Sequence, residues 1–263
     1  MEIIAALVGA SFGSFLTALT YRLPKGLNIA KGRSICPHCK NQIAWYDNVP
    51  LLSFLILKGK CRSCGKKISL RYPLIEAATA LLFVFYFLVL SGCPSSGTLG
   101  VLCSWQANFG VFSYLFAGVV ISVLTAIFVI DLEKKIIPDG LIFIGILFVF
   151  VFYLLLAPDL VFKSFLTGFT LASFFLAIHL LTLGRGMGLG DVKFVVLGGM
   201  VLGWPQSAVW LFGSFVSGAV IGVILILLKK AKFGREIPFG PYLVASFFFT
   251  LIYGEKILNL YLK

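Results

Sequence analysis

The segment VFSYLFAGVVISVLTAIFVID, residues 111–131, decides the fold of this chain. Twenty uncharged residues run from Val111 to Ile130 and end at Asp131. At 1.5 Å per residue, a helix of this length crosses the roughly 30 Å of hydrocarbon in a bilayer. The pattern recurs along the chain, in which 60% of the 263 residues are hydrophobic and 12% are charged. Because a soluble protein carries about 25% charged residues, the sequence predicts an all-α polytopic membrane protein.

Apolar runs predict about eight transmembrane helices, with a small polar insert between the first two. We expect a first transmembrane helix over residues 1–21, a cytoplasmic insert over 22–72 and a helical bundle over 73–263. The first segment lacks the basic start and the small-residue cleavage site of a signal peptide, so it is expected to stay as an anchor. The eight helices are expected near residues 3–21, 73–91, 110–130, 140–157, 162–182, 192–204, 207–228 and 241–254.

Lysine and arginine gather in four connecting segments, which hold 19 of the 22 basic residues. Because basic loops stay in the cytoplasm, this predicts that both termini face outward and that these four segments are cytoplasmic. The formal charge of +12 then has a topological origin. Since the basic residues are scattered over short loops, we expect the lipid bilayer as a partner and no nucleic acid. The four segments are 22–72, 131–139, 183–193 and 229–240.

Two aspartates stand at predicted helix ends, where the apolar chain meets water. Asp131 follows the run described above, and Asp191 ends the glycine-rich segment 186–191. A carboxylate costs roughly 2.5–3.5 kcal/mol at mid-membrane, and the chain has only ten acidic residues. These facts favour a functional use for both aspartates. The alternative is two interfacial charges, each paired with a nearby lysine.

Glycines and prolines near the basic loops predict special backbone structure. Three glycines precede Asp191, and without Cβ atoms they allow positive φ and the close approach of a substrate backbone; a tight interhelical turn is the alternative. Pro238 and Pro241 bracket a segment that is expected to be non-helical. We interpret it as the mouth of a substrate site, with a simple loop as the alternative. The glycines concerned are Gly186, Gly188 and Gly190 before Asp191, and Gly240 between the prolines.

Two Cys-x-x-Cys pairs, Cys36–Cys39 and Cys61–Cys64, lie in the insert, 21 residues apart. Four thiolates supplied by two turns suit tetrahedral Zn²⁺ and leave no open position, so the metal is expected to be structural. Redox dithiols or disulfides are the alternative, which a reducing cytoplasm disfavours. His38 is expected to be a bystander. The apolar residues between the pairs predict either a small core or a surface against the membrane: Trp45, Tyr46, Val49, Leu51, Leu52, Phe54, Leu55 and Ile56.

Several other polar residues carry narrower expectations. Cys93 and Cys103 lie in a charge-free outer loop over residues 92–109, where a disulfide and two unpaired thiols stay equally open. His179 lies in the predicted fifth helix and is expected to be neutral and hydrogen-bonded. Asp139 follows Pro138 and is expected to be the N-cap of the fourth helix.

Taken together, these motifs resemble the type IV prepilin peptidases, bacterial membrane aspartic proteases. The resemblance covers almost the whole chain in five ordered matches. Thr17 and Glu133 depart from the residues common in that family, and the second departure leaves Asp131 aligned with the family's first catalytic aspartate. The matching segments are 13–16 (GSFL) with 22–24 (RLP), the paired cysteines with 59–61 (GKC), 68–76 (ISLRYPLIE), the two aspartate motifs, and 234–241 (GREIPFGP).

The resemblance implies an activity and a location. Asp131 and Asp191 are expected to share a proton and to activate a water molecule against a peptide bond. The implied substrates are prepilin or pseudopilin helices, whose basic leader is removed after a glycine at the cytoplasmic face of the inner membrane. Many family members with the cysteine insert also methylate the new N-terminus with S-adenosyl-L-methionine, and Gly59 is where we would look first for that activity.

Two alternatives to this function stay open. A peptidase of the same family could lack methylation. A transporter with a zinc-containing insert is the alternative from another class, although transporters place ionisable groups near the midplane on broken helices. The aspartates here are expected at helix ends, which suits hydrolysis just outside the hydrocarbon.

Overall fold

The structure is a computed structural model that describes residues 1–28, 34–93, 100–184, 186–229 and 238–261. Every regular element in these ranges is a helix, and extended pairing there is limited to two isolated bridges, which confirms the predicted all-α class. The chain divides into two compact units. The first holds residues 1–91 and 117–126, and the second holds residues 92–116 and 127–263.

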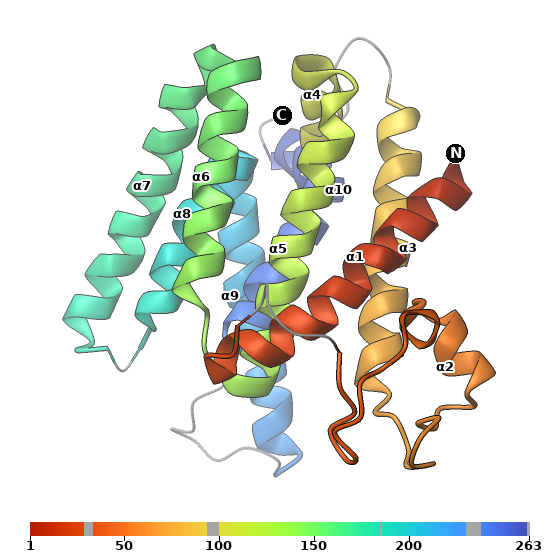
Figure 1. The fold of residues 1–263 in the computed structure, drawn as a ribbon. Helices are drawn as coiled ribbons and strands as arrows, with labels where there is room; N and C mark the ends of the chain where they lie inside the picture. The colour runs from red at the N-terminus through yellow and green to blue at the C-terminus, as the bar shows by residue number, and fades with distance from the viewer. Residues whose placement is uncertain (29–33, 94–99, 185, 230–237, 262–263) are drawn as a thin grey trace. The chain divides into compact units, whose positions relative to one another are not determined.

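The first unit is built on the close contact of α1 (Glu2–Arg22) with α3 (Arg71–Ser91) (Figure 1). Gly9 and Gly13 lie four residues apart, so they share one face of α1. A Cβ atom on Gly13 would lie 2.7 Å from the Cα of Glu76, and one on Gly9 would lie 2.9 Å from the Cα of Ala80. Small residues at such a crossing let two membrane helices pack backbone against backbone.

The insert between α1 and α3 holds three short elements: η1 (Leu23–Lys25), η2 (Trp45–Asn48) and α2 (Leu52–Ile56). The small apolar core expected here is wrong. Of the eight apolar residues named for it, only Leu51 and Phe54 are half-buried, and the other six are exposed. So short a segment has too little apolar surface to enclose a core of its own.

The second unit packs around α8 (Leu189–Leu202), which contacts α6, α7, α9 and α10. Glycines allow the close contact with α7, because a Cβ atom on Gly168 would lie 2.6 Å from the Val196 carbonyl oxygen. The indole N–H of Trp210 donates to the Leu243 carbonyl (2.7 Å) and joins α9 to α10. The helices around α8 are α6 (Asp139–Leu156), α7 (Pro158–Leu181), α9 (Gln206–Leu227) and α10 (Gly240–Tyr261). The unit also holds α4 (Gly100–Phe109) and the two ends of α5 (Phe112–Lys134).

Among the described residues, seven helices are long and apolar enough to cross a membrane: α1 with η1, α3, α5, α6, α7, α9 and α10. The helix expected over 192–204 is present as α8, but its 14 residues extend only about 21 Å. Residues 194–202 of α8 are all buried. The apolar sequence of α8 therefore reflects burial within protein, which a composition count cannot distinguish from burial in lipid.

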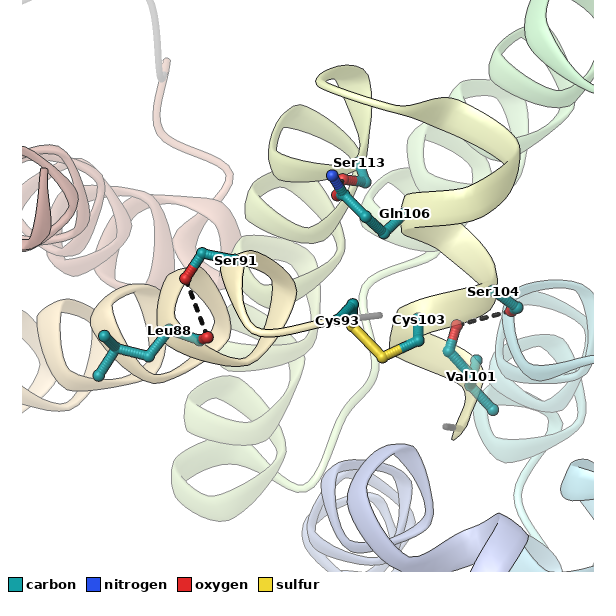
Figure 2. The surroundings of a disulfide bond; sticks show 8 residues. All are labelled: Leu88, Ser91, Cys93, Val101, Cys103, Ser104, Gln106 and Ser113. Carbon is teal, nitrogen blue, oxygen red and sulfur yellow. Dashed lines mark hydrogen bonds between the residues drawn. A yellow bond between two sulfur atoms is a disulfide. The ribbon is translucent and has the colours of Figure 1, made fainter. Parts of the chain in front are cut away.

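The loop expected over residues 92–109 is wrong in its second half, because residues 100–109 form α4 (Gly100–Phe109). Trp105 and Phe109 of this helix pack on Phe116, with ring centroids 4.9 and 5.2 Å apart. Figure 2 shows the disulfide that joins Cys93 to Cys103 of α4. The disulfide alternative is thus the one that the structure contains.

Two expectations at helix starts are also wrong. Asp139 is the first residue of α6 and not its N-cap, which is Pro138. Its carboxylate instead accepts a hydrogen bond from Lys193 Nζ (2.8 Å).

Pro241 lies within the first turn of α10, where a helix needs no N–H donor, so the non-helical segment ends before Gly240. Residues 234–237 of the same motif lie outside the described residues.

Candidate functional site

Asp131 lies in the last turn of α5 and is only 4% exposed. Its Oδ2 atom accepts a hydrogen bond from the backbone N–H of Gly240 (2.9 Å), the first residue of α10. A Cβ atom at position 240 would lie 2.6 Å from the same oxygen. Glycine is therefore required at 240, because only a residue without a side chain brings its N–H to this carboxylate.

Asp191 lies in the first turn of α8, where its Oδ2 atom accepts the backbone N–H of Gly188 (3.2 Å). Burial, and then the charge of Asp131, raise the pKa of Asp191 to about 6, although the Gly188 bond acts in the opposite direction. The charge of Asp131 therefore acts on the carboxyl group of Asp191.

The loop between α7 and α8 is fastened by two side chains from the last turn of α7. His179 Nδ1 lies 2.7 Å from the Met187 carbonyl oxygen, so the nitrogen that faces it carries the proton. Thr182 Oγ1 accepts the backbone N–H of Gly186 (3.1 Å) and donates to the Ile178 carbonyl (2.7 Å). These bonds set the path of the chain into Asp191. They confirm that His179 is hydrogen-bonded, at the end of its helix.

The expectation of positive φ does not hold at Gly186, Gly188 and Gly190. Among the described residues of this loop, Leu183 (50°) and Gly184 (77°) have positive φ, and they turn the chain out of α7. The glycines before Asp191 instead fill tight places. A Cβ atom on Gly186 would lie 2.9 Å from Thr182, and one on Gly190 would lie 3.1 Å from Ile137.

Both aspartates line one cavity of about 860 Å³, a volume within the range of ligand-binding sites. One wall is apolar and comes largely from α9 and from the chain around the start of α10, where the tilted rings of Phe215 and Phe239 have centroids 5.4 Å apart. The cavity is also lined by four of the predicted site residues, Gly186, Gly188, Gly190 and Pro238. The fifth, Gly240, donates its N–H to Asp131, which lines the cavity. The lining includes Ile136, Ile137, Met187, Leu189, Gly218, Ala219 and Tyr242, with the charged groups of Lys135, Asp139 and Lys193.

Two carboxyl groups in one sheltered cavity can share a proton and act as a pair of acid and base. The ionised member can take a proton from water, while the protonated member donates to a carbonyl oxygen. The apolar wall beside them suits a hydrophobic segment of a substrate.

The four cysteines of the insert form a second candidate site, in the first unit. Their sulfur atoms all lie within 4.8 Å of one another, so the cluster could hold a metal ion, and His38 is not a member. The two turns repeat one geometry, since Cys36 N–H donates to Asn41 and Cys61 N–H donates to Lys66, both at 2.9 Å. Backbone N–H groups at Cys39 and then His38 favour the thiolate and lower the pKa of Cys36 to about 6, against the effect of burial.

Gly59 follows α2 with a positive φ of 68°. Its N–H donates to the Phe54 carbonyl (2.9 Å), and a Cβ atom there would lie 3.1 Å from the Phe54 ring. The structure therefore gives Gly59 a role in turning the chain back toward the second cysteine pair.

The fold and the sites define a class of protein: a multi-pass helical membrane protein with two aspartates that line one cavity and a four-cysteine insert. Comparison with known sequences specifies the family. Residues 7–90 match the bacterial peptidase A24 N-terminal domain, and residues 118–223 match the type IV leader peptidase family. The chain belongs to the type IV leader peptidase family. The first match contains all four cysteines and the second contains both aspartates.

Curated relatives match this chain over nearly its full length. A prepilin leader peptidase/N-methyltransferase of Aeromonas hydrophila is 35% identical, over 95% of this chain and 90% of the relative. Proteins of the same name from Pseudomonas aeruginosa and Bacillus subtilis are 33% and 31% identical, over 98% and 99% of this chain and 92% and 97% of the relatives. No solved structure matches the chain.

Sequence reasoning missed the positioning roles of His179 and Thr182. A histidine and a threonine at the end of an apolar helix indicate nearby hydrogen-bond partners, because buried polar groups need them. Their partner, the loop before Asp191, was not evident, since the loop turns back onto the helix only in the folded chain.

We expect His179→Phe to loosen the loop before Asp191, because the Met187 carbonyl loses its donor while the ring volume is kept. An unpaired buried carbonyl costs about 1–3 kcal/mol, so local opening should rise roughly tenfold or more. Hydrogen–deuterium exchange of the amides of residues 183–188 measures this. His179→Asn keeps an N–H near the Nδ1 position and should exchange like the native chain. Equal exchange in the two variants would contradict the role of the hydrogen bond.

We expect Asp131→Asn to lower the pKa of Asp191, because removal of a like charge favours ionisation. Folding raises the pKa of Asp191 from 3.8 to about 6, so the folded protein binds this proton more tightly than the unfolded chain does. Protonation of Asp191 therefore adds to the stability of the fold, and this contribution is lost as the pH rises through about 6. Infrared titration of the protonated carboxyl band measures the midpoint. Asp139→Asn should leave it unchanged. A midpoint that stays near 6 in Asp131→Asn would show that the two aspartates are not coupled.

Proposed function

We propose that this protein is a membrane-embedded aspartic endopeptidase that removes the leader of prepilins or pseudopilins and then methylates the new N-terminus. The observation that carries the peptidase function is that Asp131 and Asp191, at the ends of two helices, line one cavity. Family membership and the names of the relatives support the substrate class and both activities.

We assign Asp131 as the base and Asp191 as the acid of the pair. The Gly240 N–H at the N-terminus of α10 stabilises negative charge on Asp131. The raised pKa of Asp191 favours its protonated form beside that charge. Asp131 takes a proton from water as the water oxygen bonds to the scissile carbonyl carbon, and Asp191 gives its proton to the carbonyl oxygen. The tetrahedral intermediate then collapses: its C–N bond breaks as the nitrogen takes the proton that Asp131 holds, and one hydroxyl of the intermediate returns a proton to Asp191. The products are an amine and a carboxylic acid.

The cavity also supports an arrangement for the substrate. The apolar wall of Phe215, Phe239 and Tyr242 suits the hydrophobic helix that follows the cut, and the carboxyl groups lie at helix ends, where the peptide bond emerges from hydrocarbon. The distribution of basic residues supports placing this cavity, and the insert over residues 22–72, on the cytoplasmic side of the inner membrane. Both termini then lie outside, with α8 as a short eighth crossing beside the seven long helices. Residues 73–263 would then form the peptidase bundle, and 1–21 the first anchor.

Zn²⁺ is the metal we propose for the four cysteines. A tetrahedral ion with Zn–S bonds of about 2.3 Å needs sulfur atoms about 3.8 Å apart. The Cys36 and Cys64 sulfur atoms lie 3.9 Å apart, so the cluster fits Zn²⁺ with little rearrangement. Four thiolates complete its coordination, so the ion would hold the two turns together without taking part in a reaction.

S-adenosyl-L-methionine as the methyl donor follows from the relatives' names. The donor would supply one methyl group to the amine that cleavage releases. Gly59, the sequence candidate for this activity, has a backbone role that any side chain would disturb. A loss of methylation on its substitution therefore fits a damaged turn as well as a lost contact with the donor.

We expect Asp131→Asn and Asp191→Asn each to reduce leader cleavage by at least about 10³-fold, because neither half of an acid–base pair works alone. Mass spectrometry of a prepilin incubated with the purified protein measures the loss of the leader. Asp139→Asn changes an acidic residue on the same cavity and should retain cleavage within a fewfold. Full cleavage by either of the first two variants would refute the proposed mechanism.

We expect Cys36→Ser and Cys61→Ser to release Zn²⁺ and to impair methylation more than cleavage, because the insert and the aspartate cavity belong to different units. Metal analysis of the purified protein measures the first effect, and the gain of one methylene on the cleaved product measures the second. His38→Ala should keep its metal. Full metal content in both serine variants would exclude the proposed site.

A further inference from the structure

The short helix α2 carries an apolar face that no described part of the chain covers. Leu52, Leu55 and Ile56 recur at helical spacing and therefore share one side of α2. Leu55 is 70% exposed and Ile56 is 72% exposed. Phe54 points elsewhere, against Gly59, at 3.1 Å from an added Cβ atom. So exposed an apolar face in so small an element favours a partner outside the described residues.

The depth of α2 relative to the membrane follows from one hydrogen bond. The backbone N–H of Leu51, the residue before α2, donates to Oε2 of Glu76 (2.8 Å). Glu76 belongs to the membrane-spanning helix α3 and is itself buried, close to Gly13 of α1. It lies five residues after the start of α3, which places it about 7.5 Å along the helix axis. Figure 1 shows α2 beside this half of α3.

A depth of that size corresponds to the boundary between headgroups and hydrocarbon, because headgroups occupy roughly 5–8 Å on each side of a bilayer. The residues around α2 have the chemistry of that boundary. Trp45, 76% exposed, precedes α2, and the exposed Lys58 and Lys60 follow it. Tryptophan is enriched at membrane interfaces, and lysine there meets anionic headgroups.

We propose that α2 is an interfacial helix whose Leu52, Leu55 and Ile56 lie in the edge of the bilayer, with Lys58 and Lys60 toward anionic lipid. The insert is then held at the membrane by lipid contact in addition to its two chain connections. This inference does not depend on the proposed catalytic function, since it uses only the contacts of the first unit.

The test is photo-cross-linking of the full chain in vesicles of phosphatidylethanolamine and phosphatidylglycerol. We place p-benzoylphenylalanine at Leu55, at Leu81 on the exposed side of α3, and at Lys66 in the second cysteine turn. Leu81 reports a site within hydrocarbon, and Lys66 reports a polar surface of the insert. Lipid adducts are counted by mass spectrometry of the peptides. We expect the Leu55 yield to be within about threefold of that at Leu81, and at least about tenfold above that at Lys66.

Leu52 is a second position on the same face, so the test does not depend on one variant. Adducts at both Leu52 and Leu55 support the proposal. Absence of lipid at both positions, with adducts at Leu81, overturns it. Equal yields at Leu55 and Lys66 also overturn it, because contact would then be indiscriminate. A cross-link from Leu55 to a second copy of the chain, or to an added prepilin, in place of lipid would assign the face to a protein partner and refute the lipid contact.

Discussion

The bond from the Gly240 N–H to the Asp131 carboxylate joins groups 109 residues apart, and the cavity around the aspartates depends on it. It fixes the end of α5 against the start of α10 and gives a buried carboxyl oxygen a backbone donor inside a largely apolar unit. Since a Cβ atom at 240 would collide with that oxygen, the contact requires glycine. A carboxylate buried without such a donor would favour its neutral form. The bond therefore governs both the shape and the charge of the cavity.

The second carboxyl group reaches the same cavity from the first turn of α8. The preceding loop lines that cavity as well, so its polar groups lie in a protein-lined space. His179, Thr182 and Asp191 satisfy these groups locally. Burial at the start of α8 also raises the pKa of Asp191 toward the range where one proton can be shared. The same short helix thus positions the acid and sets its affinity for a proton.

The sequence predicted what depends on local pattern. Apolar runs located the seven long helices, and the spacing of cysteines predicted the sulfur cluster. It was wrong where a distant contact decides the outcome: α4 forms against Phe116, and Asp139 pairs with Lys193 instead of capping α6. The glycines before Asp191 predicted positive φ and the close approach of a substrate backbone, whereas Gly186 and Gly190 lie where a Cβ atom would press on Thr182 and Ile137. These features depend on contacts between residues that are distant in the sequence, and the order of residues does not reveal which distant residues meet.

The six cysteines follow two opposite sulfur chemistries within one chain. Cys93 and Cys103 are oxidised to a disulfide, whereas the four cysteines of the insert are free thiols. A strong reductant that protects the thiols also opens the link beside α4, and an oxidant that closes the link endangers the thiols. The two sets of cysteines therefore need opposite redox conditions. Purification has to preserve both the disulfide beside α4 and the thiols of the insert.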